Sequence, residues 1–106
     1  MTQIEGISED GVLNGSTWHV YIILTDKNHL YTGIATDIDR RFQEHMDMAD
    51  GRVNARGAKF FRSQRPLEVV YRASFPDRSA ALRHERLIKS LSPGQKRRLI
   101  ADNSVS

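Results

Sequence analysis

Residues 17–35 read TWHVYIILTDKNHLYTGIA, two apolar runs joined by a short polar segment. The first run, Thr17 to Leu24, is rich in β-branched and aromatic residues and predicts a well-buried strand. Residues 26–28 (DKN) are turn formers, and the second run, His29 to Ala35, predicts another strand. Two short strands on either side of a polar turn indicate an antiparallel hairpin.

The segment after the hairpin predicts an amphipathic helix. Thr36 is expected to cap its free amides, and Asp39 follows three residues later in an acidic version of the capping box. Apolar residues recur at helical spacing and are expected to form the buried stripe: Ile38, Phe42, Met46 and Ala49. Residues 51–65 then read as a long basic connection, with room for some helix.

One more strand and two more helices are expected in the C-terminal half. Pro66 starts a predicted strand that continues through LEVVYRASF, residues 67–75. Asp77 is expected to cap a helix that ends near residue 90, and Pro93 fits the first turn of a final basic helix. That last helix is expected over residues 93–101. The order β-β-α-β-α-α predicts an α/β (α+β) fold with a small three-stranded antiparallel sheet flanked by helices.

Length and composition limit the possibilities further. A chain of 106 residues has room for one domain, expected over residues 17–102 after a flexible tail over residues 1–16. No apolar run reaches the roughly 18 residues of a membrane span, and the start does not resemble a secretory signal. We therefore expect no membrane association and a cytoplasmic location. Without cysteine, the chain forms no disulfide and no Cys-type zinc site.

Basic residues are clustered, although the net charge is only +3. The segment 52–65 contains five cations, no acid, and the pair Phe60-Phe61. The cations of this cluster are Arg52, Arg56, Lys59, Arg62 and Arg65. A second cluster contains Lys89, Lys96, Arg97 and Arg98. Basic stretches with interleaved aromatics are typical of nucleic-acid binding, but each cluster taken alone can equally be a solvated surface.

Two tyrosines and a glycine are the first candidates for chemistry. Tyr21 and Tyr31 lie in the two predicted hairpin strands, and both phenols can face one side if the register permits. Gly33 follows Tyr31 by two residues and suits either a tight bend or the approach of another molecule's backbone. Strand tyrosines are more often plain core residues.

Charged residues on the helices are the other candidates. Arg41 and His45 stand at i and i+4 of the first helix, on the flank of its apolar stripe. Glu85 lies between apolar positions of the second helix, where a partly buried carboxylate needs a cation or a hydrogen-bond donor. Each has an alternative: an Arg41–Asp37 pair, a His45 that only packs, and a Glu85–Lys89 ion pair.

The ordered set of motifs is specific where each motif alone is weak. The set comprises Val20-Tyr21-Ile22, Tyr31-Thr32-Gly33, Arg41, His45 and Glu85. It resembles the GIY-YIG nuclease superfamily, and more closely its small stand-alone bacterial members, the YhbQ-like group. The strings GAKFFR at residues 57–62 and KSLSPGQKRRLI at residues 89–100 are similar to strings of that group. The resemblance covers about residues 18–101.

The resemblance implies an endonuclease that hydrolyses phosphodiester bonds with one divalent metal ion, Mg or Mn. The counterpart of Glu85 holds the metal, and that of Arg41 stabilises charge on the phosphorus. A tyrosine, either Tyr21 or Tyr31, helps to deprotonate the attacking water, and His45 assists it or contacts the phosphate. The cations expected to grip the backbone of the nucleic acid are Lys59, Arg62, Arg65 and Lys89.

The sequence also departs from the family pattern. His19 stands where a glycine is expected, Thr32 where an isoleucine is expected, and Ile34 where some relatives carry lysine. The asparagine that buttresses many family sites has no counterpart in residues 89–95. These departures concern the catalytic rate more than the fold.

We therefore expect an enzyme that acts on nucleic acid in repair or recombination, on DNA in preference to RNA, with an RNA substrate left open. The first alternative is a catalytically inactive nucleic-acid-binding module of the same fold, and the second is a protein–protein adaptor. A homodimer or a protein partner is left open, since so small a domain can bind weakly alone.

Overall fold

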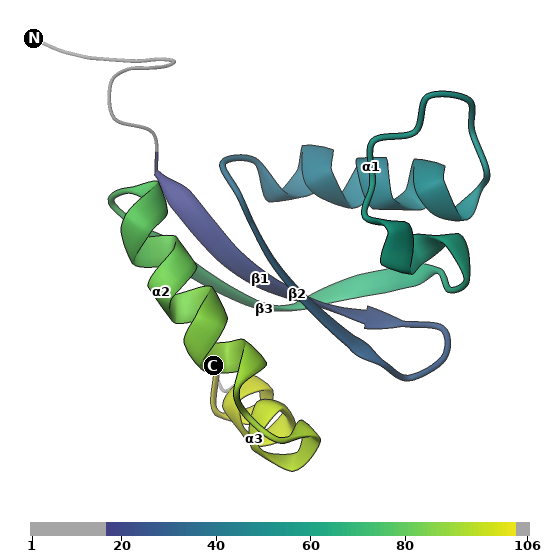
Figure 1. Cartoon of the computed structure of the whole chain (residues 1–106). Helices are drawn as coiled ribbons and strands as arrows, with labels where there is room; N and C mark the ends of the chain where they lie inside the picture. Colours follow the sequence, from purple (N-terminus) through teal and green to yellow (C-terminus); the bar gives the residue numbers. More distant parts are fainter. Residues whose placement is uncertain (1–16, 104–106) are drawn as a thin grey trace, which may run out of the picture.

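The computed structural model describes residues 17–103, and the expected tail over residues 1–16 lies outside them. The element order is β-β-α-β-α-α, as predicted, with one additional 3₁₀ turn, η1, before the third strand (Figure 1). The elements are β1 (Trp18–Thr25), β2 (Leu30–Ala35), α1 (Ile38–Ala49), η1 (Lys59–Arg62), β3 (Pro66–Phe75), α2 (Arg78–Lys89) and α3 (Pro93–Asn103).

The three strands form an antiparallel sheet in the order β2-β1-β3. This confirms the predicted α+β fold and makes the most buried strand, β1, the central one. Residues 25–29 close the hairpin, and Asn28 takes a positive φ of 62°, which asparagine tolerates better than most residues. Because β1 lies between β2 and β3, the strand β2 is an edge of the sheet.

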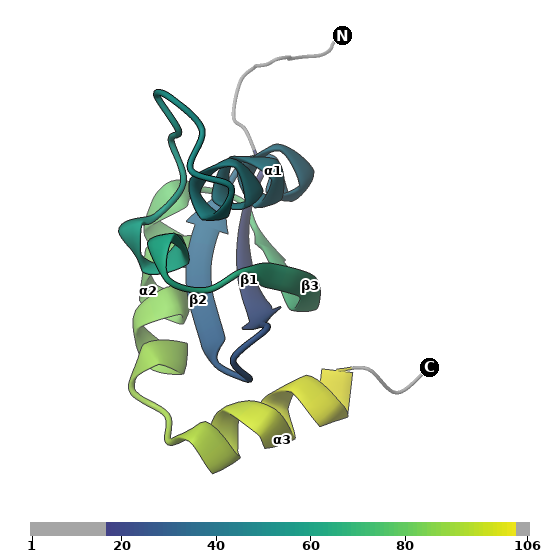
Figure 2. The ribbon, with the colours of Figure 1, turned by 90° about the vertical axis from the view of Figure 1, so that its right-hand side faces the viewer.

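Helices cover both faces of the sheet (Figures 1 and 2). On one face, α1 and η1 pack on a cluster that includes Tyr21, Ile23 and Phe61. On the other face, α2 and α3 cover a cluster that includes Val20 and Ile22. Successive β1 side chains alternate between the two clusters, as the pleat of a strand requires.

The cap of α1 differs from the prediction. Asp37, not Thr36, is the N-cap: its backbone is extended and its carboxylate accepts a 3.0 Å hydrogen bond from the amide of Arg40. Asp39 does not complete a capping box, and its carboxylate faces Arg72 at 3.8 Å. A carboxylate at the N-cap satisfies a free amide and also interacts favourably with the helix dipole. Asp77 caps α2 in the same way, as predicted.

The buried side of α1 also differs from the predicted stripe. The buried side chains are Ile38 and His45, whereas Met46 and Ala49 are only partly buried. The stripe is rotated because the segment after α1 folds back over the helix and covers His45. Among residues 17–103, no helix has the length and apolar character needed to cross a membrane.

Candidate active site

Tyr21 and Tyr31 lie on the same side of the sheet. The register pairs Tyr21 with Gly33 and Ile23 with Tyr31, and the two phenol rings are 6.4 Å apart between centroids. A Cβ atom on Gly33 would lie 2.5 Å from the Tyr21 hydroxyl oxygen. Gly33 thus makes room for the Tyr21 phenol to cross β2, a contact within the sheet that neither sequence-based explanation for this glycine anticipated.

His45 connects α1 to Tyr21. Its side chain is fully buried, and its Nε2 lies 2.9 Å from the Tyr21 hydroxyl oxygen. On the other side of the ring, the amide N–H of Ala58 donates to Nδ1 over 3.1 Å. Because an amide N–H can only donate, Nδ1 carries no proton and the proton of the neutral imidazole is on Nε2. His45 therefore donates its Nε2–H to the phenol oxygen.

The electrostatics of His45 agree with this assignment. Burial, together with the positive charge of Arg41, lowers the pKa of His45 to about 4. At neutral pH the ring is uncharged and its one free lone pair is already used by Ala58. It follows that His45 orients Tyr21 by donation and does not accept the proton of the tyrosine.

Gly57 brings Ala58 to the histidine. A Cβ on Gly57 would lie 2.4 Å from the carbonyl oxygen of Glu44 and 2.7 Å from the Cα of His45. Only a residue without a side chain allows the loop backbone so close to α1. The sequence prediction did not include Gly57 or Ala58 as site residues, although the string GAKFFR drew attention to this segment.

Arg41 lies one turn before His45 and is held at two points. Its Nη1 donates to Glu44 Oε1 over 2.9 Å and to the carbonyl oxygen of Arg56 over 2.8 Å. The expected alternative partner, Asp37, caps the helix instead. Burial lowers the pKa of Arg41, but the bond to Glu44 and the nearby Tyr21 phenol outweigh it, so the pKa is raised above its ordinary value.

The Tyr21 phenol stays protonated in the free protein. Burial is the largest cause that raises its pKa, and the neighbouring Tyr31 adds to it. The positive charge of Arg41 acts in the opposite direction. Because burial outweighs the effect of Arg41, the phenol ionises only when further positive charge binds next to it.

Glu85 reaches this site from the other layer. It lies on α2, with a side chain that is 14% exposed, and pairs with Lys89 Nζ over 3.3 Å. Its negative charge is nevertheless near enough to raise the pKa of Tyr21. Glu85 on α2 and Arg41 on α1 thus act in opposite directions on the pKa of the Tyr21 phenol.

Comparison with known proteins agrees with the geometry. The sequence pattern described as the GIY-YIG catalytic domain matches residues 17–98. The chain belongs to the GIY-YIG family. It is 42% identical over 87 residues to UPF0213 protein YhbQ of Escherichia coli (strain K12), a match that covers 82% of this chain and 80% of the relative. YhbQ of Escherichia fergusonii gives the same identity and coverage.

A solved structure is also similar. The solution NMR structure of the UPF0213 protein BH0048 from Bacillus halodurans is 32% identical, with a TM-score of 0.49. That match covers 80% of this chain and 83% of the other. Membership of the GIY-YIG family places the chain in a superfamily of nucleases, which act on nucleic acid.

The positions that depart from the GIY-YIG pattern have structural roles here. His19 Nδ1 lies 2.9 Å from Ser74 Oγ and so ties β1 to β3. Ile34 packs in the cluster beneath α2 and α3. Thr32 is buried on that side too, and its hydroxyl has no hydrogen-bond partner among residues 17–103. Thr32 and Ile34 face away from the α1 side of the sheet, where Tyr21 and His45 meet, whereas His19 lies on that side, beside the first turn of α1.

The basic residues expected to contact nucleic acid fall into two groups. Lys59 and Arg62 lie exposed on η1, and no ion pair holds them within the described chain. Arg65 pairs with Asp50 over 2.7 Å, and Lys89 pairs with Glu85. The structure thus leaves Lys59 and Arg62 free to meet phosphate and gives the other two a protein partner.

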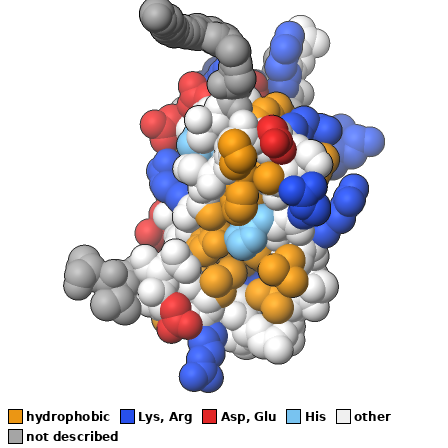
Figure 3. Space-filling model, turned by 90° about the vertical axis from the view of Figure 1, so that its left-hand side faces the viewer, with side chains coloured by type: hydrophobic (Ala, Val, Ile, Leu, Met, Phe, Trp, Pro, Cys, Tyr) orange, Lys and Arg blue, Asp and Glu red, His pale blue; other side chains and the backbone are white. Residues whose placement is uncertain are grey.

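A second tyrosine–histidine pair lies on the opposite face of the GIY-YIG domain. The Tyr71 hydroxyl is 2.8 Å from His84 Nε2, and the His84 ring packs on Tyr71 and Phe75. Apolar side chains gather around a histidine on the side of the molecule seen in Figure 3. Burial raises the pKa of Tyr71 and lowers that of His84. This pair belongs to the packing of α2 on β3, on the far side of the sheet from Tyr21.

Proposed function

We propose that this chain is an endonuclease that hydrolyses phosphodiester bonds of DNA with one divalent metal ion, Mg or Mn, in repair or recombination in the cytoplasm. Family membership supports a nuclease. The single observation that carries the proposal is the fixed Tyr21–His45 hydrogen bond, with Arg41 and Glu85 both acting on the same phenol. A purely structural tyrosine needs no such set of charges.

In this proposal Tyr21 is the general base: its ionised form, the phenolate, accepts the proton of the attacking water. The Nε2–H of His45 stabilises the phenolate oxygen, because a hydrogen bond to the charged form favours that form. Arg41 lowers the pKa of the phenol, although not enough to overcome burial in the free protein. Tyr31 packs its ring against Phe60 and Phe61 and shapes the site beside Tyr21.

Arg41 has a second part in the reaction. The phosphorus gains negative charge as the nucleophile adds, and a fixed cation aimed at that charge lowers the barrier. Arg41 keeps its charge at all relevant pH values, and its bonds to Glu44 and the carbonyl of Arg56 restrict its position. Such restriction reduces the reorganisation that the transition state would otherwise require.

The donor set around Glu85 fits one Mg²⁺ or Mn²⁺ held largely by water and phosphate. No group of three or more His, Cys, Asp or Glu side chains in residues 17–103 can enclose a metal ion. Mg²⁺ commonly binds through one or two carboxylates plus waters and substrate phosphates, and the mostly buried Glu85 is a ligand of that kind. When bound, the ion supplies Lewis-acid stabilisation of the phosphate and lowers the pKa of bound water.

The second candidate is a binding module that has lost catalysis. The Glu85–Lys89 ion pair favours it, since Lys89 occupies the carboxylate that the metal would need. The pair is a partly exposed i, i+4 contact, and such contacts contribute only about 0.3–0.5 kcal/mol, so a divalent ion can displace the lysine. Retention of the Tyr21–His45 bond beside Arg41 favours the enzyme.

Cleavage of labelled branched and linear DNA by the purified full chain tests the proposal, with Mg²⁺, Mn²⁺ or EDTA. Products that need the metal and disappear in Glu85→Gln, but persist in Glu68→Gln on the exposed surface of β3, support the nuclease. Matched RNA substrates test the preference for DNA. If wild type binds these substrates and cuts none of them, the binding module becomes the better account.

A further inference from the structure

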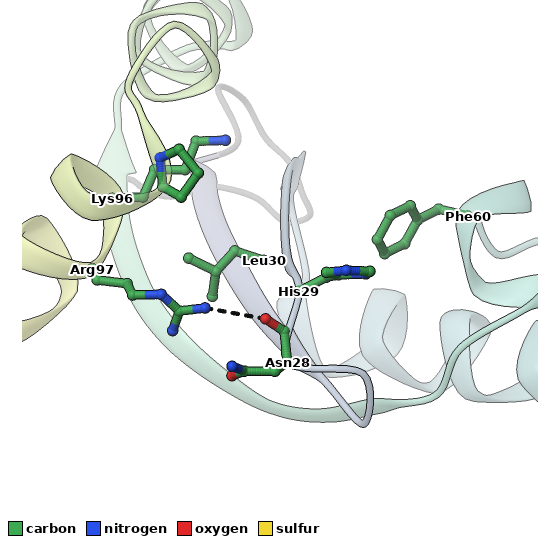
Figure 4. A pocket seen from close by; sticks show the side chains of 7 residues that line it. Asn28, His29, Leu30, Phe60, Lys96 and Arg97 are labelled. Atoms are coloured by element: carbon green, nitrogen blue, oxygen red, sulfur yellow. Dashed lines mark hydrogen bonds between the residues drawn. The ribbon is translucent and has the colours of Figure 1, made fainter.

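A cleft lies at the end of β2, next to the candidate active site. Its volume is about 330 Å³, at the small end of the range of ligand sites. Hairpin residues 28–30, Phe60 of η1, and Pro93, Lys96 and Arg97 of α3 line it. In Figure 4 the α3 side chains stand on one side of the cleft and Phe60 on the other, with the His29 ring directed toward Phe60.

The cleft spans the outer edge of the sheet. Leu30 packs with the cluster beneath α2 and α3, whereas Phe60 packs with the cluster beneath α1. Because β2 is an edge strand, no other described strand closes this side. Two apolar walls, one of them an aromatic ring, thus face a gap that is open to a planar ligand.

Tyr31 joins the cleft to the catalytic side chains. Its ring is 5.2 Å from that of Phe60 and 5.3 Å from that of His45, between centroids. Along β2, Leu30 and Gly33 are separated by about 10 Å at the usual rise of a strand. A ligand bound in the cleft therefore lies close to the Tyr21 hydroxyl, since that hydroxyl lies over Gly33 on the same strand as Leu30.

The charge of the cleft favours a polyanion. Its lining contains Lys96, Arg97 and His29 but no acidic residue. Arg97 donates to the carbonyl oxygen of Asn28 over 3.1 Å, which fixes its guanidinium against the hairpin. Asn28 presents that carbonyl from a left-handed backbone conformation. A fixed guanidinium and a second cation beside an aromatic wall are a combination that binds a nucleobase together with its phosphate.

We propose that this cleft binds one unpaired nucleobase of the strand being cut, stacked on Phe60, with Lys96 and Arg97 near its phosphate. The inference rests on the proposed function and adds a subsite to it. The cleft holds the strand through the planar face that all bases share, so it positions the adjacent phosphodiester at Tyr21 without reading sequence.

Oligonucleotides with a single abasic residue, moved stepwise around the mapped cleavage position, test the proposal. Binding is measured by fluorescence anisotropy in EDTA, with wild type, Phe60→Leu and Leu67→Ala, an exposed β3 leucine that serves as the matched control. We expect one position at which base removal weakens binding to wild type and Leu67→Ala by roughly 5- to 150-fold. At that position base removal costs Phe60→Leu little.

Two further measurements keep the result interpretable if Phe60→Leu folds poorly. 2-Aminopurine at the same position should be quenched on binding to wild type, and less so with His29→Ala, whose side chain is exposed. Lys96→Gln should weaken intact and abasic strands equally and reduce the salt dependence of binding. Free dAMP distinguishes a mononucleotide site from a strand subsite.

The outcomes separate this inference from the proposed function. If wild type cuts DNA but every abasic strand binds as tightly as the intact one, the subsite is wrong and the nuclease stands. If dAMP binds with the same dependence on Phe60 while abasic strands bind normally, the cleft is a mononucleotide site and the inference is overturned. If wild type binds no oligonucleotide even at low salt, the proposed function fails, and the inference fails with it.

Discussion

The hydroxyl oxygen of Tyr21 accepts a 2.9 Å hydrogen bond from Nε2 of His45, whose Nδ1 is in turn held by the backbone amide of Ala58. This arrangement fixes the tautomer of the histidine and therefore the direction of the bond. It makes Tyr21 a phenol whose ionised form the protein is ready to stabilise, while burial keeps it protonated until further positive charge is present.

Removal of the Tyr21 hydroxyl should abolish most of the activity. General-base catalysis contributes about 10²- to 10⁴-fold, so we expect Tyr21→Phe to lower kcat by that order with little change in KM. Tyr31→Phe keeps the ring that packs on Phe60 and Phe61 and should retain more activity. Steady-state cleavage kinetics measure both; a larger loss in Tyr31→Phe would assign the base to the other tyrosine.

The buried neutral His45 should make stability depend on pH. Its pKa is about 4 in the folded chain and near 6.5 in a free side chain. Between these values the unfolded chain binds the extra proton, so the stability contributed by this group is intact above about pH 6.5 and is lost as the pH falls toward 4. The expected slope is roughly 1 kcal/mol per pH unit.

Urea unfolding at stepped pH measures this effect in wild type and His45→Gln. Glutamine does not titrate, so the variant should lack this slope even if it is less stable throughout. Equal slopes in the two proteins would show that His45 is not the group responsible. His84, whose pKa burial also lowers, is the internal comparison, since His84→Gln should remove only its own contribution.

The chain order of the elements could be predicted because each has a local signal. β-Branched residues mark β1, and Asp77 marks the start of α2. The shared face of Tyr21 and Tyr31 depended on register, which the sequence left conditional and the hairpin turn determines. The cap of α1 was placed one residue early, because Thr36 and Asp37 are adjacent and both are good capping residues.

The site itself could be predicted only in part. The sequence placed Arg41 and His45 on one helix face, but it treated His45 as a flank residue because the segment that buries it had no regular pattern. Gly57 and Ala58 act through backbone proximity, which leaves no periodic signal. Glu85 on α2 and Tyr21 in β1 belong to different layers of the fold. Their electrostatic interaction depends on tertiary packing, which has no local signal in the sequence.

A methyl group on Gly33 should displace Tyr21. The added Cβ would lie 2.5 Å from the hydroxyl oxygen and 2.7 Å from Cζ, so the ring must move. A displacement of about 1 Å can reduce a rate by about 10²-fold, and overpacking costs about 1–3 kcal/mol of stability. Gly94→Ala is the matched control, since its Cβ meets nothing closer than 4.0 Å. Equal activity in the two variants would contradict this role of Gly33.

Loss of Lys89 should make the metal easier to bind. In Lys89→Gln the carboxylate of Glu85 no longer has its 3.3 Å ion pair, so a divalent cation meets no competitor. We expect the Mg²⁺ concentration for half-maximal cleavage to fall by about 2-fold, in line with the weak energy of such pairs. Arg98→Gln removes the same charge from the exposed face of α3 and should leave the metal requirement unchanged.

Lys59 and Arg62 should act on nucleic-acid affinity, and Arg65 on stability. Each exposed η1 cation that contacts a phosphate contributes about one unit to the slope of log affinity against log salt, so Lys59→Gln and Arg62→Gln should each flatten that slope by about one unit. Arg65 is already paired with Asp50 over 2.7 Å, and its amide donates to Asp26. Its replacement by glutamine should cost up to about 1 kcal/mol in urea unfolding and change the salt slope little. A salt slope altered by Arg65→Gln as strongly as by Arg62→Gln would mean that the Asp50 pair opens when DNA binds.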